Sequence, residues 1–167
     1  MNRVLLGLLV ASALTATGLG AQDRHQGASA ALAELGPCQF LAVFAHPDDE
    51  TFATGTLAKL AARGVCVQLV YATSGDAGGD LTGRGLSGEA LGAERELEMR
   101  RGAEALGLPR APHFLRHPDG KVQENWQAVL EDVEAVIAEI QPRVVLTFGP
   151  DGYYGHADHL GARGGVS

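Results

Sequence analysis

Several features that point to particular functions are scarce in this sequence. Two of its 167 residues are cysteine, aromatic residues make up 5%, and 13 Lys and Arg are outnumbered by 20 Asp and Glu. The two cysteines are too few and too poorly placed for a cysteine-based zinc site. A formal charge of −7, with no cluster of basic residues, disfavours nucleic acid and anionic membrane surfaces as partners. With 46% apolar residues, the chain still suffices for one domain with a hydrophobic core.

The one long apolar run lies at the N-terminus, at residues 4–19. Arg3 is the only charged side chain among the first 21 residues, and the small residues at 18–21 are typical of a cleavage site. This pattern predicts a secretory signal peptide at residues 1–21, and hence an exported protein, periplasmic or extracellular. A membrane anchor is the weaker interpretation, because the run is short and is diluted by Ser, Thr and Gly. We expect no membrane span after signal cleavage.

Strand-like and helix-like patterns alternate through the rest of the chain. Residues 22–37 are rich in Ala, Gly and Gln and are interpreted as a surface lead-in, and the domain is expected at 38–167. Short apolar runs are followed by segments with apolar residues three or four positions apart. Strands are expected at 39–45, 65–73, 112–116 and 143–148, and helices at 51–63, 89–106 and 125–140. This order predicts an α/β fold with a mostly parallel sheet and helices on both faces.

The two cysteines lie close to the starts of the first two expected strands. Cys38 precedes the first strand and Cys66 lies near the start of the second. Neighbouring parallel strands would bring them within disulfide distance, and an exported protein would permit the bond. Such a bridge would stabilise the fold by roughly 3 to 4 kcal/mol in the chain-entropy model. Two buried thiols are the equally weighted alternative.

Polar residues gather in the turn that follows the first strand. His46 and Asp49 are three residues apart, so both side chains can point into a common space as metal ligands. Asp48 lies beside them and is free to take a proton from water as a general base. Glu50 is interpreted as a carboxylate at a helix start, where the helix dipole favours it.

A second polar cluster, His156-Ala157-Asp158-His159, follows the fourth strand. Ligands of doubly wound sheets bind beyond the carboxyl ends of the strands, where the strand order reverses. If the first strand neighbours both the second and the fourth, this cluster faces His46 and Asp49. A third ligand from either His156 or His159 then completes a catalytic zinc set, which would also accept iron, cobalt or manganese. His156 could also polarise a substrate carbonyl or protonate a leaving group.

For three other features of the sequence, the residues alone indicate no role in the chemistry. His117 begins a His-Pro-Asp triplet like that of His46, but Gly120 follows it in place of a second acid. The glycine-rich loop at 74–88 lacks the Lys-Ser/Thr ending of a phosphate-binding loop and is expected to form a flexible rim. From the charge pattern alone, Arg95 belongs to a solvated helix face.

Five motifs in order resemble the PIG-L/LmbE-like N-acetylglucosaminyl deacetylases, over about residues 40–161. They are Ala45 to Glu50, Thr73 to Asp76, Arg95 to Glu98, Pro118 to Gly120, and His156 to His159. The resemblance implies a Rossmann-like sheet and a zinc-dependent hydrolase. It further implies removal of an N-acyl, typically acetyl, group from an N-acetylglucosamine-type sugar or glycoconjugate.

The resemblance also implies roles for particular residues. The zinc ligands would be three side chains: His46, Asp49 and His159. Asp48 would be the general base, and His156 would stabilise the oxyanion or donate a proton. Asp158 would orient His156, and Arg95 would lie near the sugar and bind the substrate.

The sequence departs from the family pattern at two places. Ala157 stands where members commonly have proline, a change that leaves the ligands in place. Members also continue past this motif with a helix and further strands, whereas this chain stops at Ser167. We therefore expect a product truncated at its C-terminus. A catalytically incomplete fragment that binds metal or carbohydrate without turnover is the alternative hypothesis.

Overall fold

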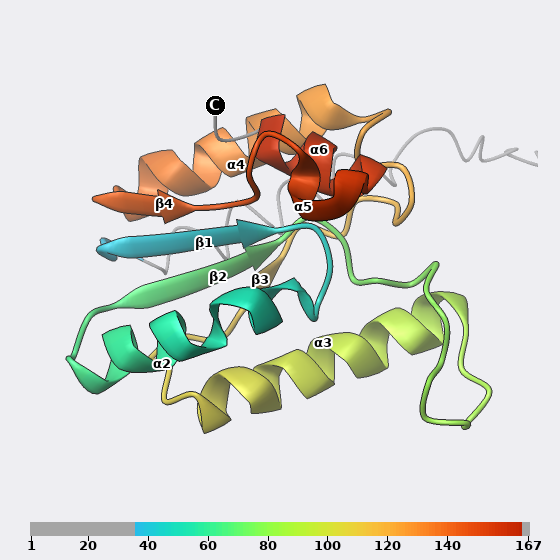
Figure 1. Cartoon of the computed structure of the whole chain (residues 1–167), viewed down its shortest axis with the longest axis horizontal. Coiled ribbons are helices and arrows are strands. Elements are labelled where there is room, and N and C mark those ends of the chain that lie inside the picture. Colours follow the sequence, from blue (N-terminus) through green and yellow to red (C-terminus); the bar gives the residue numbers. More distant parts are fainter. Residues whose placement is uncertain (1–35, 165–167) are drawn as a thin grey trace, which may run out of the picture.

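The computed structural model describes residues 36–164, which contain one four-stranded sheet (Figure 1). The strand order is β3-β2-β1-β4 and every pair is parallel. The strands are β1 (Phe40–Phe44), β2 (Val67–Tyr71), β3 (His113–Phe114) and β4 (Val144–Leu146). β1 therefore neighbours both β2 and β4, which is the arrangement that the site prediction requires. The expected signal peptide lies outside the described residues.

Helices cover both faces of the sheet. They are η1 (Asp49–Ala53), α2 (Thr54–Ala62), α3 (Gly88–Ala105), α4 (Trp126–Ile140), α5 (Gly152–Gly155) and α6 (Ala157–Gly164). α2 and α3 lie on one face, and α4, α5 and α6 lie on the other (Figure 1). The predicted α/β fold, with a parallel sheet between two helical layers, is confirmed. Within residues 36–164, every helix is too short or too polar to span a bilayer.

Alternate residues of β1 supply the two hydrophobic cores. Leu41 and Val43 pack with the buried face of α4, whereas Ala42 and Phe44 pack with residues of α2 and α3. All four are buried, since β1 is a central strand covered on both sides. A continuous apolar run is therefore the expected signature of this strand, and the sequence has it.

The apolar stripe on α4 fastens this helix to the sheet. Val129, Val133, Val136 and Ile140 are fully buried and recur at spacings of three and four residues. Burying a side chain of this size stabilises the fold by about 1.5 to 3 kcal/mol. The helix ends at Ile140, and its C-cap Gln141 donates its N–H to the carbonyl of Ile137 at 2.8 Å and turns the chain away with a left-handed backbone.

Several elements differ from the sequence predictions. β3 and β4 are shorter than expected, and Val144 of β4 is exposed at the sheet edge. The helix expected at 51–63 is divided into η1 and α2. The hydroxyl of Thr54 donates to carbonyls of the preceding turn at this junction, which competes with regular helical bonding.

α6 is absent from the sequence prediction because glycines weaken its helical pattern. Gly161 is needed there for packing. A Cβ at this position would lie 2.7 Å from the backbone of Val122, so α6 approaches the turn after β3 as closely as a glycine allows. This contact brings the second polar cluster against the rest of the site.

The cysteines form a disulfide, with their Cα atoms 5.2 Å apart. The parallel register explains the pairing, because Phe40 lies opposite Val67 and its N–H donates to the carbonyl of Cys66 at 3.1 Å. Cys38 and Cys66 are thus bonded, which decides between the two alternatives left by the sequence. The bond lies at the end of the sheet opposite the polar turns.

Candidate metal centre and active site

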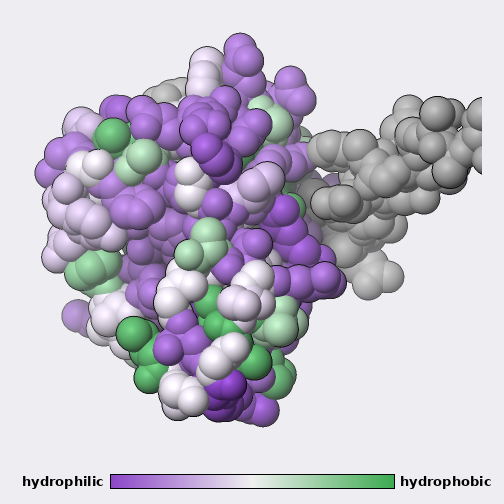
Figure 2. All heavy atoms as spheres, turned by 90° about the vertical axis from the view of Figure 1, so that its right-hand side faces the viewer, coloured by the Kyte–Doolittle hydropathy of each residue, from purple (hydrophilic) through white to green (hydrophobic). Residues whose placement is uncertain are grey.

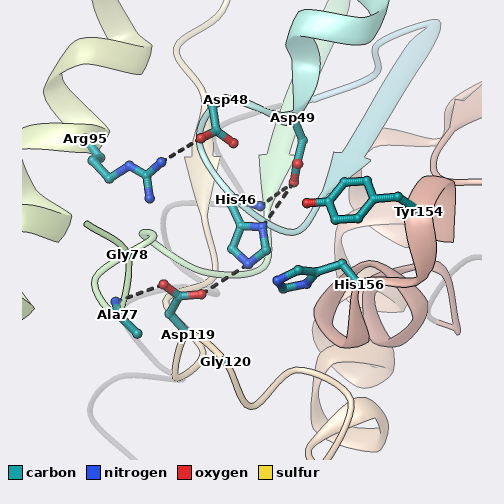
Figure 3. Close-up of a pocket in the computed structure, with 10 residues that line it drawn as sticks. All are labelled: His46, Asp48, Asp49, Ala77, Gly78, Arg95, Asp119, Gly120, Tyr154 and His156. Atoms are coloured by element: carbon teal, nitrogen blue, oxygen red, sulfur yellow. Dashed lines mark hydrogen bonds and ion pairs between the residues drawn. The ribbon is translucent and has the colours of Figure 1, made fainter. Parts of the chain in front are cut away.

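The polar clusters meet at the carboxyl end of the sheet. Figure 2 views the molecule from this end, where hydrophilic side chains predominate between small hydrophobic patches. A pocket of about 290 Å³ opens here, between the turns that follow β1, β2 and β3 and the segment of α5 and α6 (Figure 3). The two turns that the sequence predicts to face each other are therefore part of one pocket.

His46 has carboxylates beside both of its ring nitrogens. Its Nδ1 lies 3.5 Å from Oδ2 of Asp49, while its Nε2 lies 3.1 Å from Asp119 and 3.2 Å from Asp158. Burial lowers the pKa of His46, but hydrogen bonds to Asp119 and Asp49 outweigh it and raise the pKa to about 10.

His159 is fully buried and presents one free ring nitrogen to Asp49. Its Nδ1–H donates to the carbonyl of Gly152 at 3.0 Å, and its ring stacks on Phe148 at a centroid distance of 4.0 Å. Nε2 lies 3.1 Å from Oδ1 of Asp49 yet has no hydrogen-bond partner. Burial lowers the pKa of His159, so the ring is neutral. A lone pair directed at a carboxylate is repulsive alone and favourable when a cation lies between them.

The donor atoms fit a divalent metal ion. Nitrogens of His46, His156 and His159 lie within 4.8 Å of one another, and Asp49 contacts two of these rings. His46, Asp119 and Asp158 form a second such group in the part of the chain that the structure describes. The first group is the better candidate, because it includes the buried and unpartnered Nε2 of His159. Two imidazoles and a carboxylate form a common catalytic ligand set for zinc.

The contacts of Asp158 correct one expectation. Its buried carboxylate accepts the N–H groups of Gly120 at 2.7 Å and Val122 at 3.0 Å, and its third contact is His46. The carboxylate does not orient His156, because α6 directs it toward the turn after β3, where N–H groups need acceptors. The backbone N–H of Asp158 donates instead to Nδ1 of His156 at 3.2 Å. A neutral His156 therefore carries its proton on Nε2.

Asp48 and Arg95 form an ion pair at the rim of the pocket. Nη2 of Arg95 lies 2.6 Å from Oδ2 of Asp48, and Nη1 donates to the carbonyl of Gly75 at 3.0 Å (Figure 3). Desolvation by the surrounding turn raises the pKa of Asp48 above its ordinary value, against the opposing effect of Arg95, although 62% of the side chain is exposed. Arg95 thus lines the pocket, so its interpretation as part of a solvated face is wrong. The resemblance had placed it near the sugar.

The backbone at Asp48 is strained and is held by its neighbours. Its φ of 148° is rare for a residue with a side chain, and such strain commonly occurs at functional sites. The carboxylate of Glu50 accepts the N–H of Asp48 at 3.1 Å and the hydroxyl of buried Tyr71 at 2.7 Å. Glu50 therefore does more than face the helix dipole, because it fixes the turn that carries Asp48.

Asp119 and Tyr154 line the pocket but are missing from the predicted site. Asp119 accepts the N–H of Ala77 at 2.8 Å, and its hydrogen bond to His46 lowers its own pKa to about 2. A signal for Asp119 is its position directly after the third strand, since the carboxyl ends of parallel strands share one edge. Tyr154 precedes His156 by two residues. His117, excluded by the sequence, contacts Asp132 at 2.8 Å and does not line the pocket.

The sequence comparisons find one family and related enzymes. Residues 41–166 match the PIG-L family, described as GlcNAc-PI de-N-acetylase. A 1D-myo-inositol 2-acetamido-2-deoxy-alpha-D-glucopyranoside deacetylase from Corynebacterium urealyticum is 34% identical over 153 residues, covering 75% of this chain and 45% of the relative. The chain spans about half the length of the curated relatives it matches.

Two solved structures share this fold and differ in activity. An N,N'-diacetylchitobiose deacetylase from Pyrococcus horikoshii matches with a TM-score of 0.59 and 25% identity, covering 89% of this chain and 57% of its own. A 4-carboxy-2-hydroxymuconate hydratase from Pseudomonas putida matches with a TM-score of 0.61 and 25% identity, covering 77% and 54%. The fold alone therefore does not fix the reaction, and the site must decide it.

Proposed function

The chain belongs to the PIG-L family, and from this membership we propose that it is a zinc-dependent N-deacetylase of N-acetylglucosamine-type sugars or conjugates. The names of the Corynebacterium and Pyrococcus relatives both specify an acetylated amino sugar as substrate. The observation that carries the proposal is the buried Nε2 of His159, unpartnered and 3.1 Å from Asp49, beside Asp48. This donor set, with Asp48 as the proposed base beside it, supports turnover over the alternative of binding alone.

The proposed zinc ligands are His46, Asp49 and His159. A divalent cation held there would lower the pKa of a bound water and polarise an amide carbonyl. Burial of His159 and the carboxylate contacts of His46 hold both rings in place before the metal arrives. Other divalent metals would also suit this donor set.

The remaining polar groups divide the proton transfers between them. Asp48 takes a proton as water attacks the acetyl carbonyl, and its raised pKa brings it nearer to the working pH of a general base. His156 donates its Nε2–H to the oxygen that becomes negative in the transition state. Asp48 then returns the proton to the amine as the C–N bond breaks, giving acetate and a free amino sugar. Arg95 holds Asp48 and offers its guanidinium to sugar hydroxyls.

The activity is tested by acetate release from N-acetylglucosamine conjugates with the zinc-loaded protein. Asp48→Asn should lower kcat by about 10²- to 10⁴-fold, since it removes general-base catalysis while leaving the proposed ligands intact. Glu124→Gln is a matched control, because Asp48 and Glu124 side chains are 62% and 67% exposed. Zinc content should be equal in all three proteins. Undiminished turnover by zinc-loaded Asp48→Asn would refute the role of Asp48.

We propose export as well, on the pattern of residues 1–21. The disulfide between Cys38 and Cys66 suits an oxidising compartment. N-terminal sequencing of the protein expressed with residues 1–21 in a secretion-competent host should find a new start after Ala21. Retention of the intact N-terminus in the cytoplasm would contradict export.

A further inference from the structure

A tyrosine side chain is buried beneath the turn that carries Asp48. Tyr71 ends β2 and is fully buried, with its ring stacked on Phe114 at a centroid distance of 5.3 Å and tilted against Phe44 at 6.1 Å. A phenylalanine would serve this packing equally well. The phenolic hydroxyl therefore needs another explanation, because burying a hydroxyl costs free energy unless it forms a hydrogen bond.

The hydroxyl of Tyr71 donates to Glu50, and Glu50 in turn holds Asp48. The hydroxyl oxygen lies 2.7 Å from Oε2 of Glu50, and the same Oε2 accepts the backbone N–H of Asp48 at 3.1 Å. The sulfur of Met99, at 2.9 Å, is the weaker acceptor, so the proton is donated to the carboxylate. Burial and the charge of Glu50 raise the pKa of Tyr71, so the hydroxyl stays protonated and remains a donor. These two hydrogen bonds, the Tyr71–Glu50 link, join the core of the sheet to the backbone of Asp48.

The strained backbone of Asp48 decides where its side chain points. Asp48 stands at the N-cap of η1, where an aspartate ordinarily accepts an N–H of the first turn, yet its carboxylate forms no such bond. With φ 148° and ψ −17°, the residue directs its carboxylate to the pocket instead, where Arg95 holds it at 2.6 Å (Figure 3). Relaxation of this backbone would therefore turn the proposed base away from the site.

The proposed metal ligand in the same turn is held independently of Tyr71. Oδ2 of Asp49 accepts the N–H of His46 at 2.7 Å, and the N–H of Asp49 donates to the carbonyl of His46 at 3.2 Å. Neither bond involves the Tyr71–Glu50 link. Loss of the Tyr71 hydroxyl should therefore displace Asp48 and leave Asp49 in place.

We propose that Tyr71 is a positioning residue for the reaction, which acts through Glu50 to hold Asp48 in the orientation of a general base. This inference rests on the proposed deacetylase function. Tyr71 does not line the pocket, so its effect on catalysis is indirect. A general base must lie within hydrogen-bond reach of the proton that it takes, and a displacement of about 1 Å can cost about 10²-fold in rate. A hydroxyl in the core of the sheet thus governs a proton transfer at its edge.

Tyr71→Phe keeps the ring, removes only the hydroxyl and tests the proposal directly. In the zinc-loaded protein, kcat for acetate release from N,N'-diacetylchitobiose should fall roughly 10- to 100-fold, whereas KM and zinc affinity should keep their wild-type values. Glu50→Ala breaks the Tyr71–Glu50 link at its other member and should lower kcat to a similar extent. Tyr153→Phe is the matched control, because it removes the hydroxyl of a tyrosine that is 55% exposed and does not line the pocket.

The double variant Tyr71→Phe/Glu50→Ala distinguishes positioning from packing. If Tyr71 acts through Glu50, adding Tyr71→Phe to Glu50→Ala should change kcat by less than about 2-fold, since the link is already broken. A defect in the packing of β2 would lower kcat by the same factor in both backgrounds. Equal factors in the two backgrounds, or an unchanged kcat in Tyr71→Phe, would overturn the proposal.

Hydrogen exchange of the Asp48 amide, followed by NMR in the metal-free protein, gives a second readout that needs no turnover. This N–H should exchange roughly 10-fold faster in Tyr71→Phe and in Glu50→Ala, and at the wild-type rate in Tyr153→Phe. Faster exchange with an unchanged kcat would overturn the proposal and leave the proposed function standing. A wild type that releases no acetate, with exchange that still depends on Tyr71, would refute the proposed function and support the positioning of Asp48 by Tyr71.

Discussion

At the scale of single residues, His46 organises the site because its two nitrogens face different partners. Nδ1 faces Asp49, while Nε2 contacts Asp119 and Asp158. Carboxylates behind a ligating histidine fix its ring and raise its basicity, and their loss commonly weakens metal binding. Asp119 thus supports the proposed ligand His46, in addition to lining the pocket.

Asp119→Asn should weaken zinc binding by about 10- to 100-fold. The amide retains the shape of the carboxylate but removes its charge from the Nε2 side of His46. Competition with a chromogenic chelator measures the affinity. Glu134→Gln is the control, because it changes the net charge equally at an exposed residue of α4 that does not line the pocket. Equal zinc affinities for wild type and Asp119→Asn would show that Asp119 does not support the ligand.

Much of the site could be predicted from the sequence. The remainder depended on tertiary contacts that no local sequence pattern predicts. His46 and Asp49 follow β1 and His159 comes after the adjacent parallel strand β4, so the topology places all three at one edge of the sheet, and the packing of α6 through Gly161 completes their approach. Asp119 becomes part of the site through its contacts with His46 and with the N–H of Ala77, which no local pattern specifies. The contacts of Asp158 follow from the same packing, which a sequence motif cannot specify.

At the scale of elements, Glu96 joins α3 to the ends of two strands. Its carboxylate accepts the hydroxyl of Ser74 at 2.7 Å and a bidentate pair of N–H groups from Arg116 at 2.7 and 2.8 Å. Arg95, the next residue on α3, reaches the pocket from this anchored helix. Burial raises the pKa of Glu96, but bonds to Arg116 and Ser74 outweigh it and lower the pKa below its ordinary value of 4.5.

Glu96→Gln should reduce the free energy of unfolding by about 1–2 kcal/mol at neutral pH, a value discounted for the exposure of Arg116. A carboxyl with a lowered folded-state pKa stabilises the fold above its unfolded pKa, and this contribution is lost as the pH falls through the folded pKa. The difference between wild type and variant should therefore shrink below pH 4.5. Urea unfolding at pH 7 and pH 3 measures it. A difference that is equal at both pH values would contradict this role.

The sequence predicts the elements with strong local patterns better than the short ones. The apolar spacing of α4 locates this helix to within one residue, because burial against the sheet and helical periodicity coincide. β3 and β4 are defined by pairing with one neighbour each, so their lengths depend on register and not on composition. α6 contains two glycines, and one of them serves packing at the expense of propensity.

At the scale of the whole molecule, the disulfide and the proposed metal centre lie at opposite ends of the sheet. The disulfide joins the chain at the starts of β1 and β2, and the metal centre lies beyond their carboxyl ends. The two parallel strands between them are buried on both faces. Stability and site geometry should therefore respond differently to loss of the disulfide.

The double variant Cys38→Ser/Cys66→Ser should lose roughly 3–4 kcal/mol of stability, since the bond closes a long loop in the unfolded chain. Zinc affinity, measured well below the unfolding temperature, should be unchanged. Chemical denaturation with and without reductant makes the comparison, and reductant should affect only the wild type. An unchanged unfolding midpoint, or a loss of zinc affinity in the folded double variant, would contradict this separation.

We propose that the turns after β1 and β4 together form a catalytic metal centre. Acetate release from N,N'-diacetylchitobiose, measured on metal-stripped protein before and after titration with zinc, tests it most directly. We expect no release before titration and full release at one equivalent of zinc per chain. Full release by the stripped protein, or none from folded protein with zinc bound, would contradict it.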